Sequence, residues 1–324
     1  MSKYILKRFL LMIPVIIGIT FIIFCILDLT PGDPARLMLG ENATEEAVAM
    51  KRAELQLDDP FFVRYFRFLF HAVQGDFGRS YSTNQLVAKE IFSRFPTTFI
   101  LALSSVVVAV TFSVPLGILS ATKQYSLVDI VSMIFAMLAS AIPAFWLGLM
   151  LIIVFSLKLG WLPSFGFSGV KSMILPVVTM AMSFSAVIVR MTRSSMLEEI
   201  RQDYMRTALA KGASERYANQ RHALKNAMIP VLTVVGIYFG ALLGGSVIIE
   251  AVFTIPGLGT LLITAIRMKD IPTVLGCITV LAVTFSLVNL MVDLCYAFFD
   301  PRIKAQYKNS GGKKIRKLVK GTVK

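Results

Sequence analysis

The sequence is poor in charged residues, which make up only 16% of its 324 positions, and its mean hydropathy is +0.72. A soluble domain of this size needs more charge to cover its surface. Several apolar runs instead reach the roughly 20 residues that cross the hydrocarbon core of a bilayer. These runs are apolar on all sides, whereas the strands of a membrane β-barrel alternate apolar and polar residues. The chain is therefore predicted to be an all-α polytopic membrane protein.

Residues suited to catalysis or metal binding are also scarce. The chain has two histidines and three cysteines, and the cysteines fall inside apolar runs, where they resemble small buried hydrophobic residues. It contains no GxxxxGK[ST] phosphate-binding loop, no HExxH, no CxxC and no GxSxG. We therefore expect that this chain is not an enzyme and that it has no catalytic residue, no metal site and no bound cofactor.

Six membrane spans are predicted, each boundary being good to a few residues: 9–29, 98–121, 130–157, 173–190, 229–251 and 276–299. The first follows a basic start that resembles a signal peptide. Its apolar run is long, however, and no small-residue cleavage site closes it. We therefore interpret it as an uncleaved span that also directs insertion.

Basic residues gather in three places of a chain whose formal net charge is +14. Three lie before residue 9, seven between residues 191 and 228, and nine after residue 300, whereas the 30–97 segment offsets eight basic residues with nine acidic ones. Short flanks rich in Lys and Arg stay in the cytoplasm. Both termini and 191–228 are thus predicted to be inside and 30–97 outside. The pattern indicates a lipid bilayer, and not nucleic acid, as the partner of the positive charge.

Three regions follow from this topology. Residues 1–97 are predicted to hold the first span and an extracytoplasmic insert, which we expect to be a small packed cap with a helix that Thr44 starts. The aromatic and arginine-rich run that follows that helix could alternatively lie at the level of the headgroups. Residues 98–303 are the five-span core with its cytoplasmic loop. Residues 304–324 are a basic cytoplasmic tail that could lie against anionic lipid.

Four carboxylates fall in or beside the spans. Asp28, Asp129 and Glu250 are placed at or near span ends, where charges cost little, and Asp293 lies about two turns from an end. We expect Asp293 to form a structural hydrogen bond to a neighbouring helix. An ion-coupled secondary transporter would need such buried carboxylates, so it is the alternative class of function. An intramembrane hydrolase would need a nucleophile–base pair, which the chain lacks.

Two features inside the spans have both a structural and a functional interpretation. Gly236, Gly240 and Gly244 recur every fourth residue, so one helix face carries no side chains for two turns. This face predicts either ordinary packing within one bundle or a subunit interface near a substrate pathway. Pro143 and Trp146 interrupt the third span, as a simple kink or as lining of the pathway.

The cytoplasmic segment between the fourth and fifth spans is predicted to form two helices joined at a glycine. Residues 193–212 are expected to form one helix, and Gly212 follows its last turn, where a left-handed C-cap favours glycine. Ser214 can then cap the second helix. Ala208 and Ala210 narrow the end of the first helix, so that it could seat in a partner's groove. A solvated loop would need neither the caps nor the small residues.

This helix pair resembles the loop through which ABC importer permeases engage their ATPase subunits. The general pattern is approximately EAA, three residues, Gly, nine residues, then I-x-L-P. Ala208, Gly212 and Leu224 match it, whereas Arg206 stands at the glutamate and Lys225 at the proline. The dipeptide/oligopeptide/nickel branch of the family departs in the same way and reads approximately DYVRTARAKG and RHALRNA.IP. This chain has "DYMRTALAKG" and "RHALKNAMIP".

Other segments resemble the same branch and appear in the same order. They are "PGDPA" at 31–35, "GDFGRS" at 75–80, "IPAFWLG" at 142–148, "EAVFTIPGLGTLL" at 250–262 and "DPR" at 300–302. The resemblance thus covers essentially the whole chain. The long insert after the first span is similar to that of the first of the branch's two permease subunits.

The resemblance implies a type I ABC importer permease fold in a bacterial inner membrane. It implies four kinds of component: this chain, a homologous second permease, two ABC ATPase subunits that hold ATP and magnesium, and an extracytoplasmic substrate-binding protein. The expected cargo is a di- or oligopeptide, with nickel and glutathione as the cargoes of close relatives. The residues implied to dock an ATPase or couple to it are Tyr204, Arg206, Ala208, Ala210, Gly212, Ser214, His222 and Asn226. The substrate pathway is expected near Pro143, Trp146, Gly240 and Gly244.

Overall fold

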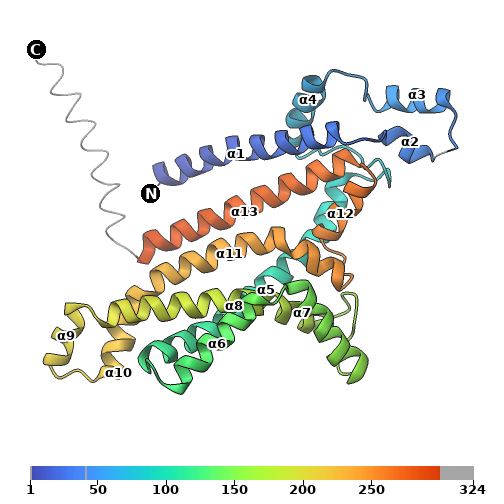
Figure 1. Ribbon diagram of the computed structural model, residues 1–324. Coiled ribbons are helices and arrows are strands. Elements are labelled where there is room, and N and C mark those ends of the chain that lie inside the picture. The colour runs from blue at the N-terminus through green and yellow to red at the C-terminus, as the bar shows by residue number, and fades with distance from the viewer. Residues whose placement is uncertain (1, 41, 300–324) are drawn as a thin grey trace, which may run out of the picture.

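The computed structural model describes residues 2–40 and 42–299, and these are almost entirely helical (Figure 1). The predicted basic tail, 304–324, lies outside the described residues. Five helices are long and apolar enough to cross a membrane: α1 (Ser2–Leu29), α5 (Val87–Thr122), α8 (Val170–Ile200), α11 (Leu224–Val252) and α13 (Ile271–Phe299). They confirm five of the six predicted spans.

The third predicted span is broken. The expected span over 130–157, with an interruption at Pro143, is instead two helices, α6 (Leu127–Ala141) and α7 (Ala144–Leu151), the latter continued by the π-helical segment η1 (Ile152–Lys158). The two halves meet at an angle of 99°. Counted as one broken span, they complete six crossings. The chain leaves α6 at Ile142, whose backbone is extended (φ −81°, ψ 122°), as favoured before a proline.

The central helix of the bundle is α8, which packs against α5, α6, α7 and α11. In the most apolar stretch of α8, 56% of the residues are buried inside the protein, whereas only 11% are buried in the corresponding stretch of α1. The largest cluster of buried side chains joins α8 to α5 and α11 through residues such as Leu101, Met180 and Leu243. Because α1 contacts mainly α13, most of its apolar surface is left for lipid.

The insert after α1 contains three short helices, α2 (Pro34–Leu39), α3 (Glu45–Glu54) and α4 (Phe61–Val73). The predicted start of a helix at Thr44 is confirmed, because the Thr44 hydroxyl is the N-cap of α3 and accepts a hydrogen bond from the backbone N–H of Ala47 at 3.3 Å. Tyr65 of α4 is buried and donates its hydroxyl to the Ile17 carbonyl of α1 at 2.7 Å. The insert is therefore packed onto α1, as expected for a cap.

Two groups of short helices lie at opposite ends of the bundle in Figure 1. One end carries α2 to α4 and α12 (Leu258–Arg267). The other carries α9 (Asp203–Ala210), α10 (Glu215–Ala218) and the π-helical turn η2 (Asn219–Ala223), together with the start of α1 and the end of α13. We call residues 201–226 the elbow. The described ends of the chain thus lie on the elbow side.

Candidate functional site

The elbow begins with a break that the sequence did not signal. A single helix was expected over 193–212, but α8 ends at Ile200 and α9 starts at Asp203. Gln202 between them has an extended backbone (φ −72°, ψ 152°). The reason lies in two buried methionines, Met196 and Met205. At about 3.6 residues per turn they would face opposite sides of one continuous helix, whereas the break lets both enter one cluster.

The bend after α9 confirms the predicted glycine cap. Gly212 has a φ of +87°, and its N–H donates to the Leu209 carbonyl at 2.9 Å. The N–H of Ala213 donates to the Ala208 carbonyl at 3.2 Å, which completes a Schellman motif. Ser214 then accepts a hydrogen bond from the N–H of Tyr217 at 3.3 Å and starts α10, as predicted. Local sequence therefore determines the bend.

The two alanines of α9 have different surroundings. Ala208 is half-buried and packs against the cluster of Met196, Met205, Ala218 and Ala223, so it helps to seat α9 on its own chain. Ala210 is exposed, and so is Gly212, around whose Cα a side chain would meet no atom within 4 Å. The apex of the elbow is thus small, open and free of other parts of the described chain.

A chain of hydrogen bonds through Glu199, Tyr204 and Asn226, which we call the strut, joins the base of α9 to two spans. The Tyr204 hydroxyl of α9 donates to the Glu199 carboxylate of α8, and the Asn226 amide of α11 donates to the Tyr204 hydroxyl at 3.2 Å. Burial, and then the hydrogen bond to Glu199, raises the pKa of Tyr204 to about 12. The phenol therefore stays neutral at physiological pH. Sequence reasoning selected Tyr204 and Asn226 but missed Glu199.

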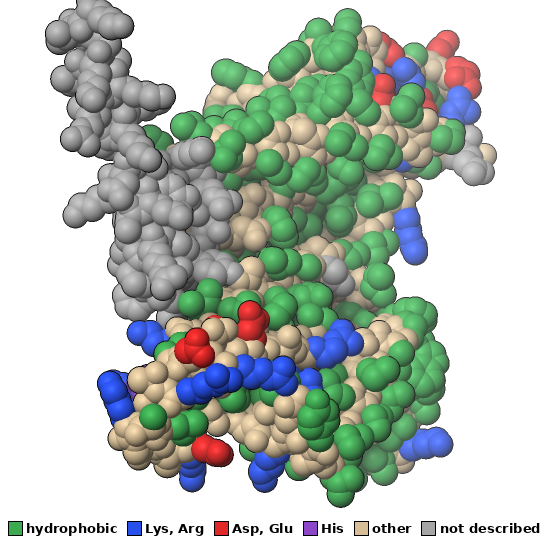
Figure 2. Space-filling model, turned by 60° about the vertical axis from the view of Figure 1, so that its left-hand side comes forward, with side chains coloured by type: hydrophobic (Ala, Val, Ile, Leu, Met, Phe, Trp, Pro, Cys, Tyr) green, Lys and Arg blue, Asp and Glu red, His purple; other side chains and the backbone are tan. Residues whose placement is uncertain are grey.

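Basic side chains surround this strut. Arg221, His222 and Lys225 line a recess together with Tyr204 and Asn226. The Arg206 side chain is 80% exposed, and its nearest described carboxylate is that of Asp203, at 3.8 Å. Figure 2 shows Lys and Arg gathered on the lower part of the molecule, which contains the elbow, with few acidic side chains among them. The elbow therefore presents a cationic surface.

Two further buried charges connect the spans, and neither was expected to be buried. Asp129 of α6 is 3% exposed and accepts two hydrogen bonds from Arg193 of α8, from Nε at 2.6 Å and from Nη2 at 2.7 Å. Glu250 of α11 is fully buried rather than being a low-cost charge at a span end. Its burial depends on Thr98, which is 152 residues away in the sequence, and on the start of α12. The side chain of Asp293 lies outside the described part of the chain.

Glu250 occupies the N-terminus of α12. Its carboxylate accepts hydrogen bonds from the N–H groups of Gly259 at 2.8 Å and Thr260 at 3.1 Å, and from the Thr98 hydroxyl at 2.7 Å. A β-carbon at Gly259 would lie 2.8 Å from the carboxylate and 2.5 Å from the backbone of Val247. Glycine is therefore required for the carboxylate to approach the helix N-terminus, where its charge is favoured.

The residues predicted to line a pathway do not all share one surface. Pro143 stands at the start of α7, so it marks a sharp bend, and Trp146 is 45% exposed. Gly240 is buried, and a β-carbon there would lie 2.6 Å from the Phe285 ring of α13. Gly244 is exposed, with nothing within 4 Å. Packing within the bundle therefore accounts for Gly240, and Gly244 keeps an open surface.

Family models match both parts of this architecture. The one described as "Binding-protein-dependent transport system inner membrane component" matches residues 113–305, and its N-terminal companion matches residues 1–102. The chain belongs to this family. It is therefore a multi-pass inner-membrane permease component of a binding-protein-dependent ABC importer, and not the catalytic subunit.

Curated relatives of the family cover nearly the whole chain. The glutathione transport system permease protein GsiC of Salmonella paratyphi A is 41% identical over 304 residues, which is 94% of this chain and 99% of that protein. The protein of the same name from Escherichia coli strain K12 is 42% identical over the same extent. This similarity confirms the resemblance to the dipeptide/oligopeptide/nickel branch.

Solved structures agree on the fold. The inward-facing MetNI methionine ABC transporter has a chain that matches 63% of this one and 93% of its own length, with a TM-score of 0.52 and 20% identity. A chain of an amino acid ABC transporter solved with histidines matches 66% of this one and 94% of its own, with a TM-score of 0.50 and 16% identity. The chain therefore has the type I ABC importer permease fold.

Proposed function

We propose that this chain is one of two homologous permease subunits of an importer for short peptides, glutathione among them. The elbow would be the place where an ATPase subunit docks. The observation that carries the proposal is the geometry of α9, which is held at its base by Met205 and leaves a small, basic apex exposed. Relatives that are named for glutathione, itself a tripeptide, support the substrate class. Nickel is the alternative cargo of the same machine.

The contacts of α9 give a physical route for coupling. Met205 joins α9 to the cluster that contains Met196 of α8, and the strut through Tyr204 reaches α11. A partner that moves the apex would therefore move both helices. Because α8 is central to the bundle, such a push favours a rigid-body change between outward and inward openings. In this proposal ATP and magnesium are bound by the two ATPase subunits, and this chain binds neither.

The charge of the elbow indicates what its partner offers. Arg206 and the basic recess are exposed and have few carboxylates near them. We therefore propose that the ATPase groove is acidic. Arg206→Glu is expected to weaken co-purification of the ATPase subunits about tenfold, which corresponds to roughly 1.4 kcal/mol. The loss should depend on salt, since exposed charges are screened. Arg36→Glu on α2, at the opposite end, is the matched control: it breaks an exposed ion pair with Glu45 but should leave co-purification of the ATPase subunits unchanged.

The proposed topology places the elbow, both termini and the tail at 304–324 in the cytoplasm, and the insert within 1–97 outside. Single cysteines in a cysteine-free background test it. Glu46→Cys should react with an impermeant maleimide in intact cells, and Ser214→Cys should react only after lysis. The reverse pattern would contradict both the topology and the docking of an ATPase at the elbow.

Transport measurements separate the cargoes and the mechanisms. The complete complex in liposomes, supplied with its binding protein, should accumulate labelled glutathione or a dipeptide only when ATP is present on the elbow side. Uptake of Ni²⁺ in preference to both would select the alternative cargo. Uptake that needs an ion gradient and persists without ATP would identify a secondary transporter and would contradict the proposal.

A further inference from the structure

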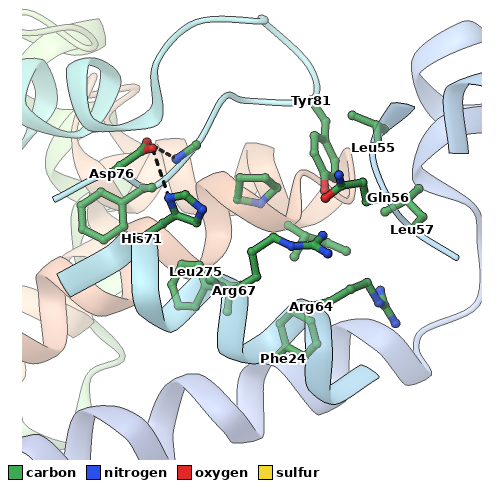
Figure 3. Close-up of a pocket in the computed structure, with 15 residues that line it drawn as sticks. Phe24, Leu55, Gln56, Leu57, Arg64, Arg67, His71, Asp76, Tyr81 and Leu275 are labelled. Atoms are coloured by element: carbon green, nitrogen blue, oxygen red, sulfur yellow. Dashed lines mark hydrogen bonds and ion pairs between the residues drawn. The ribbon is translucent and has the colours of Figure 1, made fainter. Parts of the chain in front are cut away.

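A cavity of about 260 Å³ lies in the insert, at the end of the bundle opposite the elbow. Its walls come from α4, from the loop after α3, from the loop that holds Tyr81, and from the ends of α1 and α13 (Figure 3). None of the predicted site residues lies in it, and the transport mechanism proposed above does not use it.

Three hydrogen-bond donors converge on this cavity. Figure 3 shows the Arg67 guanidinium extending beneath the Tyr81 ring, with the Gln56 amide beside the Tyr81 hydroxyl. Within the described residues, Arg67 forms one ion pair, through Nη2 to Asp59, and its Nε and Nη1 groups have no partner. The side chains of Tyr81 and Gln56 also form no hydrogen bond with any described residue. Burial raises the pKa of Tyr81 to about 12, so its hydroxyl remains a donor.

The backbone around the cavity is set for this arrangement. Gln56 has a φ of +53°, in the left-handed region that glutamine rarely adopts. Tyr81 is fixed through its backbone, because its N–H donates to the buried carboxylate of Asp270 at 3.0 Å. The Gln56 N–H donates to the Ala53 carbonyl at 3.1 Å and the Leu57 N–H to the Arg52 carbonyl at 3.0 Å, so Gln56 is the left-handed capping residue that ends α3. The backbone at Gln56 and at Tyr81 is thus fixed by contacts within the chain.

The surroundings of the cavity indicate a ligand with a polar head and apolar tails. Phe24 of α1 and Leu275 of α13 form its apolar wall. The cavity lies at the end of α1, the membrane span whose apolar surface is mostly left for lipid. A molecule whose polar head meets the donors therefore also meets apolar side chains inside the cavity, at the end of a helix that faces lipid.

Charge balance narrows the class of head. The Arg67 guanidinium is paired with Asp59, and Arg64 at the cavity wall is paired with Asp28 at 2.5 Å. His71 lies 3.7 Å from Asp76. The site thus offers hydrogen-bond donors without a net positive field. A phosphate group suits the donors, because guanidinium N–H groups form strong bonds to phosphate oxygens. A headgroup whose net charge is zero suits the paired charges of the cavity wall.

We propose that this cavity binds the headgroup of a zwitterionic phospholipid, whose phosphate accepts hydrogen bonds from Arg67, Tyr81 and Gln56. The lipid anchors α4 and its insert to the membrane surface. The binding is independent of which cargo the importer carries and of how the elbow couples to its partner.

The test uses the purified complete complex, stripped of lipid in detergent. Native mass spectrometry would measure the affinity for phosphatidylethanolamine and for phosphatidylglycerol with the same acyl chains. We expect the zwitterionic lipid to bind more tightly. Arg67→Gln should weaken its binding about tenfold, because a charged donor is lost. Tyr81→Phe, which keeps the ring, should weaken it about threefold. Arg36→Gln and Tyr217→Phe are the controls and should bind as the wild type does.

Two arms of the experiment identify the source of the phosphate. Inorganic phosphate and glycerophosphoethanolamine, which lacks acyl chains, should neither displace the lipid nor raise the melting temperature at millimolar concentration. If either does so as well as the lipid, the site binds a soluble anion and the proposal is wrong. It is also wrong if the control variants lose lipid equally. If the Arg67 and Tyr81 variants keep the lipid but fail to bind the substrate-binding protein, the cavity is a protein contact.

Discussion

The two ends of the bundle are held together in different ways. At the insert end, Asp270 and Glu250 are buried carboxylates that each accept several hydrogen bonds. Those of Asp270 come from residues 80–82, and those of Glu250 come from Thr98 and the start of α12. At the elbow, one apolar cluster and one half-exposed strut hold α9, and the apex has open surface. One end satisfies its buried carboxylates internally, whereas the other leaves charge and surface for a partner. In the function proposed above, a chain with this asymmetry is anchored at one end and driven from the other.

The largest expected effect comes from breaking the anchored end. Glu250→Ala leaves the N–H groups of Gly259 and Thr260 and the Thr98 hydroxyl without their acceptor. Each orphaned buried donor costs about 1–3 kcal/mol, so we expect loss of the folded protein. Fluorescence-detected size-exclusion chromatography and thermal unfolding in detergent measure it. Glu46→Ala on the exposed face of α3 is the control. Equal behaviour of the two variants would mean that the Glu250 carboxylate does not hold this end.

The next effect comes from straining the driven end. Gly212→Val forces a β-branched residue to a φ of +87°, at a cost of about 1–3 kcal/mol. We expect normal insertion but sharply lower substrate-stimulated ATP hydrolysis, measured on the purified complex. Gly75 ends α4 in the same hydrogen-bonded motif, with a φ of +79° and no atom within 4 Å of a β-carbon, but it lies at the insert end. Gly75→Val should therefore be similarly strained and keep its coupling. If both variants lose coupling alike, the elbow has no special role.

A smaller effect distinguishes packing from pathway on α11, which runs between the two ends. Gly240→Leu overpacks the contact with Phe285 and should destabilise the protein by about 1–3 kcal/mol. Gly244→Leu adds the same side chain in open surface and should leave the melting temperature unchanged. Transport assays of the Gly244 variant then test the pathway prediction. Unchanged uptake would exclude Gly244 from both a pathway and a subunit interface.

The smallest effect concerns the strut. Tyr204→Phe removes the hydrogen bonds to Glu199 and Asn226 and should cost about 0.5–1.5 kcal/mol. Because the folded-state pKa of Tyr204 is raised from 10.0 to about 12, its contribution is fully present below pH 10. It is lost only as the pH rises toward 12. Thermal unfolding of both proteins at pH 7, 9 and 10.5 should therefore give a constant difference at the two lower values. A difference that disappears by pH 9 would contradict a neutral Tyr204.

Much of the fold followed from the sequence because a bilayer demands long apolar helices. The caps at Thr44, Gly212 and Ser214 were also predictable, since each depends on residues within one turn. The break after Ile200 was not, because it exists to bring Met205 back toward Met196, a packing requirement that leaves no local mark. The burial of Glu250 was missed for a similar reason.

The site was only partly predictable. The family resemblance selected residues of the elbow, but it could not separate Ala208, which packs inward, from Ala210, which is exposed. The glycine face on α11 was visible as a spacing, yet the spacing did not tell that Gly236 and Gly240 meet α13 whereas Gly244 does not. The cavity in the insert escaped notice because its donors, Gln56, Arg67 and Tyr81, come from three separate segments.

The right-angled break between α6 and α7 has a consequence for how the protein is made. The second half, α7, packs at Gly148 against the Phe253 ring at the end of α11. Phe253 is synthesised roughly 100 residues later, so at about 5–20 residues per second it emerges some 5–20 seconds afterwards. Before then α7 has only α8 to pack against, for example where Gly148 meets Thr179. The packing at this corner is therefore completed only when the fifth span arrives.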